Sequence, residues 1–101
     1  MSKKVSDILP KTEILAQLAE EASELAQAAL KLRRALDGTN PTPKSVEECR
    51  KALEEEYADV VNCIIALEFF NDAAFSRMLM MRYEKEARWI SRLEEKENKN
   101  G

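Results

Sequence analysis

The sequence contains no histidine and only two cysteines, and both shortages restrict the chemistry open to it. Without histidine, no serine or cysteine nucleophile can be activated by an imidazole base. Two cysteines without histidine also cannot complete an ordinary tetrahedral zinc site within one chain. Any metal chemistry must therefore use carboxylate oxygens, which suit hard cations such as Mg²⁺ or Mn²⁺.

The chain also lacks a long apolar run. No stretch approaches the roughly 20 apolar residues of a membrane span, and residues 5–9 are too short and too polar for a signal peptide. Cys49 and Cys63 are expected on one helix, about 21 Å apart at ~1.5 Å per residue, which is far beyond disulfide reach. We therefore expect reduced, buried thiols and a cytoplasmic protein without a membrane partner.

Glycine and proline are scarce, with two and three copies, while 45% of the residues are hydrophobic and 35% are charged. This composition is typical of a helix-rich protein. At this length we expect a single all-α domain over residues 1–101, with its core at about 12–95 and a frayed polar tail at 96–101. The net charge of −3 provides no general attraction to nucleic acid, so none is expected as a partner.

Apolar residues recur with a helical period in three segments of the chain. These segments predict helices over residues 12–36, 46–70 and 72–95. Thr12 is the expected N-cap of the first helix, and Gly38 suits the left-handed position that follows it. Ser45 and Glu48 form a capping-box pattern before the second helix, and Asp72 is the expected cap of the third.

The second expected helix is apolar over an unusually wide arc. One stripe consists of Cys49, Leu53, Val60, Ile64 and Leu67. Val61 and Ile65 lie well round from that stripe, on another face. Such a helix is usually buried at the centre of a bundle, and three helices cannot easily surround it. We therefore expect three long helices in a bundle that is completed by oligomerisation, as a homodimer or homotetramer.

Four acidic side chains lie in or beside these apolar stripes. At about 100° per residue, Glu21 falls at the edge of the stripe on the first helix, and Glu24 lies one step further round. Glu56 lies inside the stripe of the second helix, and Asp59 lies at its margin. Carboxylates are rarely buried unless they are paired or bound to metal. Two stripes that face each other would bring the acids together as a cage for divalent cations.

Pairs of acidic residues three positions apart also occur by chance, because 19 acids in 101 residues produce the E-x-x-E spacing repeatedly. Most glutamates of this chain are expected on solvated helix faces, where an isolated charge contributes little to stability. The hypothesis of a metal site depends on a conjunction of features. Two acidic pairs lie on successive helices, both against the apolar stripe, in a chain that has no histidine.

The same acids belong to two motifs that resemble a known family. Residues 20–25 match the E-E-x-x-E-L signature of MazG-like nucleotide pyrophosphohydrolases, and residues 55–60 match their E-E-x-x-D-V signature. The resemblance covers residues 12–93 and implies an oligomeric all-α fold. It also implies hydrolysis of an NTP or dNTP to the monophosphate and pyrophosphate. The implied ligands of Mg²⁺, with Mn²⁺ as a substitute, are Glu21, Glu24, Glu56 and Asp59.

Three further residues are candidates for binding the nucleoside triphosphate. Lys85 and Arg88 share one face of the third helix, where they form either a phosphate clamp or a solvated face paired with nearby glutamates. Asn62 lies one turn past Asp59 and is a candidate for contacting a ligand. It falls about opposite the main apolar stripe, so a surface or subunit contact is the alternative.

Two other functions compete with hydrolysis. The first is a non-enzymatic helical module for dimerisation or interaction, in which Glu21 and Glu56 pair with basic residues across an interface. The second is binding of nucleic acid through the third helix, which the acidic net charge disfavours. Magnesium would stabilise a cage of four acids, but it would have no such effect on the interaction module.

Overall fold

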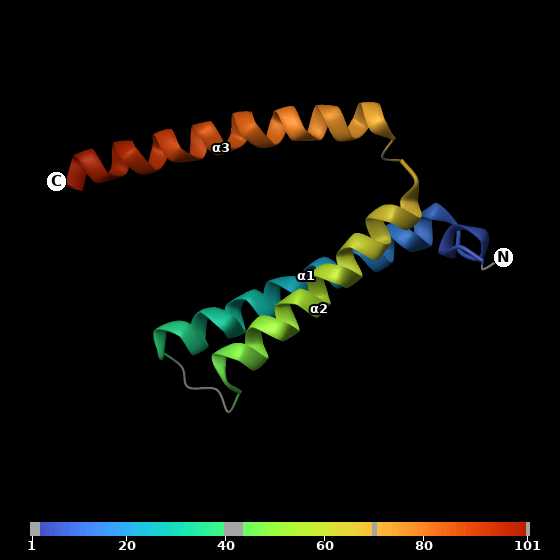
Figure 1. Ribbon diagram of the computed structural model, residues 1–101, viewed down its shortest axis with the longest axis horizontal. Coiled ribbons are helices and arrows are strands. Elements are labelled where there is room, and N and C mark those ends of the chain that lie inside the picture. The colour runs from blue at the N-terminus through green and yellow to red at the C-terminus, as the bar shows by residue number, and fades with distance from the viewer. Residues whose placement is uncertain (1–2, 40–43, 70, 101) are drawn as a thin grey trace. The chain divides into compact units, whose positions relative to one another are not determined.

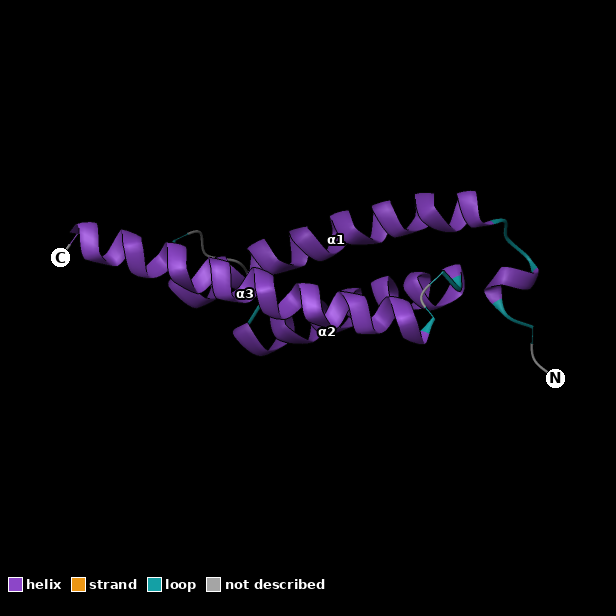
Figure 2. Ribbon diagram, turned by 90° about the horizontal axis from the view of Figure 1, so that it is seen from above, coloured by secondary structure: helices purple, strands orange, loops and turns teal. Residues whose placement is uncertain are grey.

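The computed structural model describes residues 3–39, 44–69 and 71–100, which are helices and short connections (Figure 1). A short 3₁₀ helix, η1 (Val5–Asp7), precedes three α-helices. These are α1 (Lys11–Asp37), α2 (Val46–Leu67) and α3 (Asp72–Asn100). No strand occurs among the described residues (Figure 2). The predicted all-α class is confirmed for them, and completion of a bundle by oligomerisation stays a prediction.

The chain divides into two compact units, residues 1–68 and residues 69–101, and each is described by itself. The first unit contains η1, α1 and α2, and the second contains α3. None of the described helices combines the length and the apolar character needed to cross a membrane. The organisation of residues 1–101 as a single domain stays a prediction.

Helices α1 and α2 pack against each other as an antiparallel pair (Figure 1). Ile14 of α1 and Leu67 of α2 are each only 1% exposed, and burial of such a side chain contributes about 1.5–3 kcal/mol. Ala28 and Cys49 are buried towards the other end of the pair. The apolar contacts near both ends hold the two helices together, so that their middle turns face each other across a short gap.

Local chemistry accounts for the ends of α1 and α2 that were predicted correctly. Gly38 follows α1 in the left-handed conformation, with φ 69°, and its N–H donates to the carbonyl of Arg34 at 2.9 Å. The capping box before α2 is confirmed. The Glu48 N–H donates to Ser45 Oγ at 3.1 Å, and the Ser45 N–H donates to Glu48 Oε1 at 3.2 Å.

Two predicted N-caps were wrong by one or two residues. Helix α1 already begins at Lys11, after an extended Pro10 that provides no side-chain cap, so Thr12 lies inside the first turn. Helix α3 is capped by Asn71 rather than Asp72, because the Ala74 N–H donates to Asn71 Oδ1 at 2.9 Å. In both places a cap was assigned to a polar residue that is already helical. The N-cap is the non-helical residue before the helix, and its side chain accepts from N–H groups two or three residues later.

The two later helices also end at other residues than predicted. Helix α2 ends at Leu67, before the predicted end at Phe70, which lies outside the described residues. Glu68 terminates it in the left-handed conformation, with φ 57°, and Ser6 Oγ donates to its Oε1 at 2.6 Å. This long-range hydrogen bond helps to hold a conformation that non-glycine residues rarely adopt. Helix α3 continues to Asn100, past the predicted end at Glu95.

Candidate metal centre

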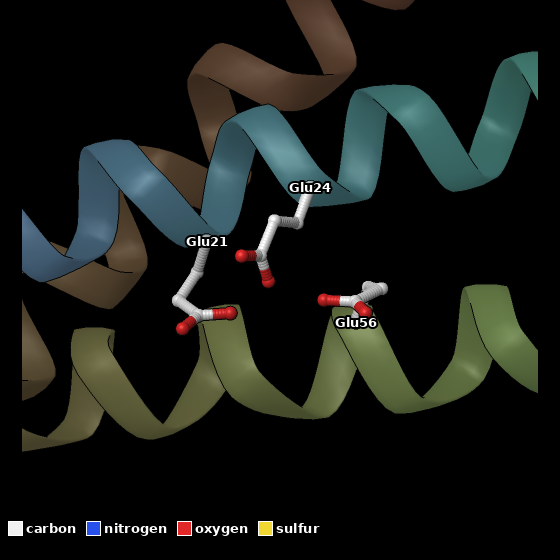
Figure 3. Close-up of side chains that lie close together, drawn as sticks. All are labelled: Glu21, Glu24 and Glu56. Carbon is white, nitrogen blue, oxygen red and sulfur yellow. The ribbon is translucent and has the colours of Figure 1, made fainter.

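Three carboxylates meet between the middle turns of α1 and α2 (Figure 3). Glu21 and Glu24 project from one face of α1, because residues three apart are neighbours on a helix surface. Glu56 projects towards them from α2. One oxygen atom of each carboxylate lies within 4.8 Å of the other two. The packing of the two helices therefore brings together three of the four acids that were predicted from the sequence.

Two oxygens of this cluster are shielded from solvent and accept no hydrogen bond from the described residues while all three carboxylates are ionised. Glu21 and Glu56 are half-buried, and the Oε2 atom of each is shielded from solvent without accepting a hydrogen bond from a described residue. The other oxygen of Glu21 accepts a hydrogen bond from Gln17 Nε2 at 2.8 Å. A buried carboxylate oxygen without a partner is costly. A cation bound by these carboxylates would reduce that cost.

Mutual repulsion dominates the electrostatics of the cluster. The negative charge of Glu21 raises the pKa of Glu24 above the usual value of a glutamate, followed by burial and by the charge of Glu56. Glu24 is the most exposed of the three, so solvent screens part of this repulsion. A raised carboxyl pKa reports a negative potential at the site, and the same potential attracts cations.

The donor set fits a small divalent cation. Mg²⁺ binds oxygen at about 2.0–2.1 Å, which puts two opposite ligands of one ion about 4.2 Å apart. Three ligands of one octahedral ion include adjacent pairs about 2.9 Å apart. The oxygens of Glu21, Glu24 and Glu56 lie within 4.8 Å of one another, so the side chains would have to draw closer together to share one ion. Carboxylates are the ligands that Mg²⁺, Mn²⁺ and Ca²⁺ prefer. The site therefore offers the ligand type that a divalent cation binds, and Mg²⁺ as its occupant stays a prediction.

The structure does not bring Asp59 into the same cluster. Asp59 is exposed and lies one turn beyond Glu56 along α2, a rise of about 4.5 Å. It lines a cavity of about 210 Å³ together with Glu21. Glu21 is therefore shared between the cluster on one side and this cavity on the other. Asp59 as a metal ligand stays a prediction.

The cavity beside Glu21 has largely apolar walls. Its lining consists of Val5, Leu9, Ile14, Gln17, Glu21, Asp59, Asn62, Cys63 and Ala66. Asn62 was expected about opposite the main stripe, yet it lines this cavity next to the acids. The sequence did not indicate a role for Gln17 or for the N-terminal segment. The signal was the presence of Val5, Ile8 and Leu9, three apolar residues among polar ones, of which Val5 and Leu9 line the cavity.

The thiol in the cavity wall is held in its neutral form. Burial raises the pKa of Cys63, and the negative charges of Glu21 and Asp59 raise it further. A protonated, buried thiol is a poor nucleophile and a poor metal ligand. Cys49 and Cys63 are both free and buried on α2, which confirms the predicted state of these residues.

Two groups of basic residues bear on phosphate binding. Lys31 and Lys44 line a hollow of about 470 Å³ with Glu24 and Glu56, on the side of the cluster away from Cys63. Lys85 and Arg88, the predicted phosphate ligands, are exposed on α3, in the unit of residues 69–101. Their assignment to phosphate binding stays a prediction, as does that of Asn62.

Comparison of the chain with family models, with curated proteins and with solved structures finds no match. The resemblance to MazG-like enzymes thus depends on the two acidic motifs alone. Three glutamates from those motifs are the ones that meet between α1 and α2.

Proposed function

We propose that the chain is a magnesium-dependent nucleoside triphosphate pyrophosphohydrolase, which converts an NTP or dNTP to the monophosphate and pyrophosphate. The observation that carries this proposal is the meeting of Glu21, Glu24 and Glu56, in which two shielded oxygens accept no hydrogen bond from the described residues. The cluster supports a site for a divalent cation. The choice of reaction comes from the resemblance of residues 20–25 and 55–60 to the family motifs.

The carboxylates would bind the metal, and one of them would accept a proton from water. Glu21 and Glu56 would bind through their buried Oε2 atoms, with Glu24 at the open margin and Asp59 near the adjoining cavity. When bound, Mg²⁺ neutralises phosphate charge and lowers the pKa of water. In hydrolysis, the water oxygen bonds to the α-phosphorus, the bond to the bridging oxygen breaks, and pyrophosphate leaves. Either Glu21 or Glu24 accepts the proton of that water.

The surroundings of the cluster suit a ligand with one apolar end and one anionic end. On one side lies the cavity with apolar walls, where the amides of Gln17 and Asn62 provide donors and acceptors. On the other side, Lys31 and Lys44 line the second hollow. A nucleobase fits the first environment. The second hollow combines Lys31 and Lys44 with Glu24, Glu55 and Glu56, so a polyphosphate chain would fit it only together with cations that neutralise the carboxylates.

The test is an assay of pyrophosphate release from each common NTP and dNTP in the presence of Mg²⁺. Glu56→Gln should reduce release roughly 1,000-fold, because several kcal/mol of charge stabilisation are lost. Glu54→Gln is the matched control, since Glu54 is an exposed glutamate of the same helix outside the cluster. Circular dichroism checks that both variants fold. Absence of release from every nucleotide at high protein concentration would refute the proposal.

The alternative of a non-enzymatic interaction module predicts a different result for the same variant. If Glu56 instead pairs with a basic residue of a second chain, Glu56→Gln weakens self-association, and Mg²⁺ does not stabilise the fold. Melting with and without Mg²⁺, combined with sedimentation of Glu56→Gln, separates the two functions.

A further inference from the structure

Helix α3 carries an apolar stripe with the spacing of a coiled-coil seam. Phe75 and Leu79 lie near its start, and Trp89 and Leu93 occupy equivalent positions two heptads later. Leu79, Trp89 and Leu93 are 51%, 60% and 52% exposed. The described part of the second unit is Phe69 and residues 71–100, and it contains no other helix. An apolar stripe of this length requires a partner element from outside the unit.

Two opposite charges interrupt the stripe at its centre. Arg82 and Glu86 occupy the two seam positions between Leu79 and Trp89, so the spacing alternates between four and three residues. They form an ion pair within the helix, with Arg82 Nη1 3.5 Å from Glu86 Oε2. Both side chains remain more than half exposed. The Arg82 guanidinium also lies over the Tyr83 ring, 4.6 Å from its centroid. Both contacts are exposed, and an ion pair with the basic residue first is weak, so a partner can compete for the two charges.

The order of residues along this stripe is self-complementary. If a second α3 lies antiparallel to the first, with the two-fold axis level with Glu84, each seam residue meets a matching one. Phe75 then faces Leu93 of the second copy, and Leu79 faces Trp89 of the second copy. At the centre, Arg82 faces Glu86 of the second copy, and symmetry repeats this pair.

The charged residues at the two ends of the stripe are also complementary in an antiparallel pair. Asp72, one seam position before Phe75, would face Lys96 of the second copy, one seam position after Leu93. Antiparallel pairing would therefore join opposite charges at the centre and at both ends. Parallel pairing in register would instead oppose Arg82 to Arg82 and Glu86 to Glu86. Such like-charge contacts are unfavourable, so the charge pattern selects the antiparallel arrangement.

We propose that α3 is a self-association surface, and that two copies of this chain pair through antiparallel α3 helices. The proposal is independent of the carboxylate cluster, because none of the seam residues belongs to α1 or α2. Failure of the nucleotide assay would leave it intact, and the reverse also holds.

The test is sedimentation equilibrium of the full chain and its charge variants. The wild type should be dimeric, with a measurable dissociation constant. Arg82→Glu and Glu86→Arg should each raise that constant roughly 100-fold, since symmetry creates two like-charge contacts per dimer. The double variant, Arg82→Glu with Glu86→Arg, should restore pairing to near the wild-type value. Glu84→Arg is the matched control, because it changes the same charge on the face opposite the stripe.

A spin label at Ala73 gives an independent test of direction, with Cys49 and Cys63 replaced by alanine. In the antiparallel dimer the two labelled positions lie roughly 33 Å apart along the helix axis. In a parallel dimer they lie side by side. A monomeric wild type at millimolar concentration, unaltered dimers of the single variants, failure of the double variant to recover, or a short label distance would each overturn the proposal. A monomer would indicate that α3 covers its stripe on its own chain.

Discussion

The α1–α2 pair and helix α3 both place charged side chains among apolar ones, but the signs of those charges differ. Between α1 and α2 the charges are all negative, at Glu21, Glu24 and Glu56. On α3 they are opposite, at Arg82 and Glu86. Like charges at one place require a cation to neutralise them, whereas opposite charges in a symmetric order can be satisfied by a second copy. The sign pattern of each region thus indicates the class of partner that it needs.

The two regions also differ in how much of their apolar surface is covered. Helix α1 buries Ile14, and α2 buries Leu67, since each helix provides a face for the other. The seam of α3 leaves Leu79 and Trp89 half exposed or more. We therefore expect the α1–α2 pair to owe its stability to contacts within one chain. Stability at α3 should instead depend on protein concentration.

Truncation of one leucine in each region should give the largest difference. Leu67→Ala removes a fully buried side chain and should lower the free energy of unfolding by about 2–5 kcal/mol at every protein concentration. Leu79→Ala should lower it only at concentrations where the wild type is dimeric. Urea unfolding at several protein concentrations measures both effects. Equal, concentration-independent losses would remove the distinction between the two regions.

Magnesium should stabilise the α1–α2 pair and should not affect α3. At a concentration 100-fold above its dissociation constant, the ion should stabilise the fold by about 2.7 kcal/mol, which raises Tm by roughly 10–20 °C for a domain of this size. Glu56→Gln should abolish most of this rise, whereas Glu86→Gln on α3 should leave it unchanged. Sodium at equal ionic strength controls for screening. A full Mg²⁺ response in Glu56→Gln would remove Glu56 from the site.

Removal of one helix cap from each region should give a smaller effect, about 1 kcal/mol each. Ser45→Ala leaves the Glu48 N–H at the start of α2 without its acceptor. Asn71→Ala does the same to the Ala74 N–H at the start of α3. The first should lower the Tm of the monomer, and the second should mainly raise the dissociation constant of the dimer. Calorimetry and sedimentation on both variants check this, and reversed outcomes would contradict it.

The smallest expected effect is the pH dependence that arises from Glu24. Its pKa is higher in the folded state than in the unfolded state, so the folded chain binds its proton more tightly. The metal-free protein should therefore lose stability as the pH rises through that pKa. Glu24→Gln should remove this loss, and saturating Mg²⁺ should also remove it.

Thermal melts of wild type and Glu24→Gln between pH 4 and 8 measure the difference. Asp37 acts in the opposite direction, since hydrogen bonds from Thr39 lower its pKa, but it contributes equally to both proteins. Glu20→Gln, an exposed neighbour on α1, serves as the control. A Glu24→Gln curve parallel to that of the wild type would exclude Glu24 as the source.

Features that depend on nearby residues were predictable from the sequence. The apolar period predicted three helices, and Gly38 and the Ser45–Glu48 capping box were located correctly. These signals arise within one turn of backbone, so no knowledge of the tertiary fold is required. The caps at Thr12 and Asp72 were wrong because several adjacent residues can begin each helix. Which one begins it depends on the backbone conformation of the residue before it, such as the extended Pro10 before α1.

The candidate site could be predicted only in part from the sequence. The positions of Glu21 and Glu56 beside apolar stripes indicated that both carboxylates face a partner helix. Whether Asp59 meets the carboxylates of α1 was not predictable, because it depends on the axial register between the two helices. The hydrogen bond from Gln17 to Glu21 and the part of Val5 in the cavity wall depend on how the chain packs around the site.

The sequence by itself determined the helical class, the acidic character of the site and the charge order along α3, because composition and helical period need no partner. Only the tertiary structure decided which acids meet. Antiparallel packing of α1 and α2 places Glu56 opposite Glu21 and Glu24 and moves Asp59 to the neighbouring cavity. The physical reason is that the register of two helices is set by the buried side chains near both ends, among them Ile14 and Leu67, and not by the acids between them.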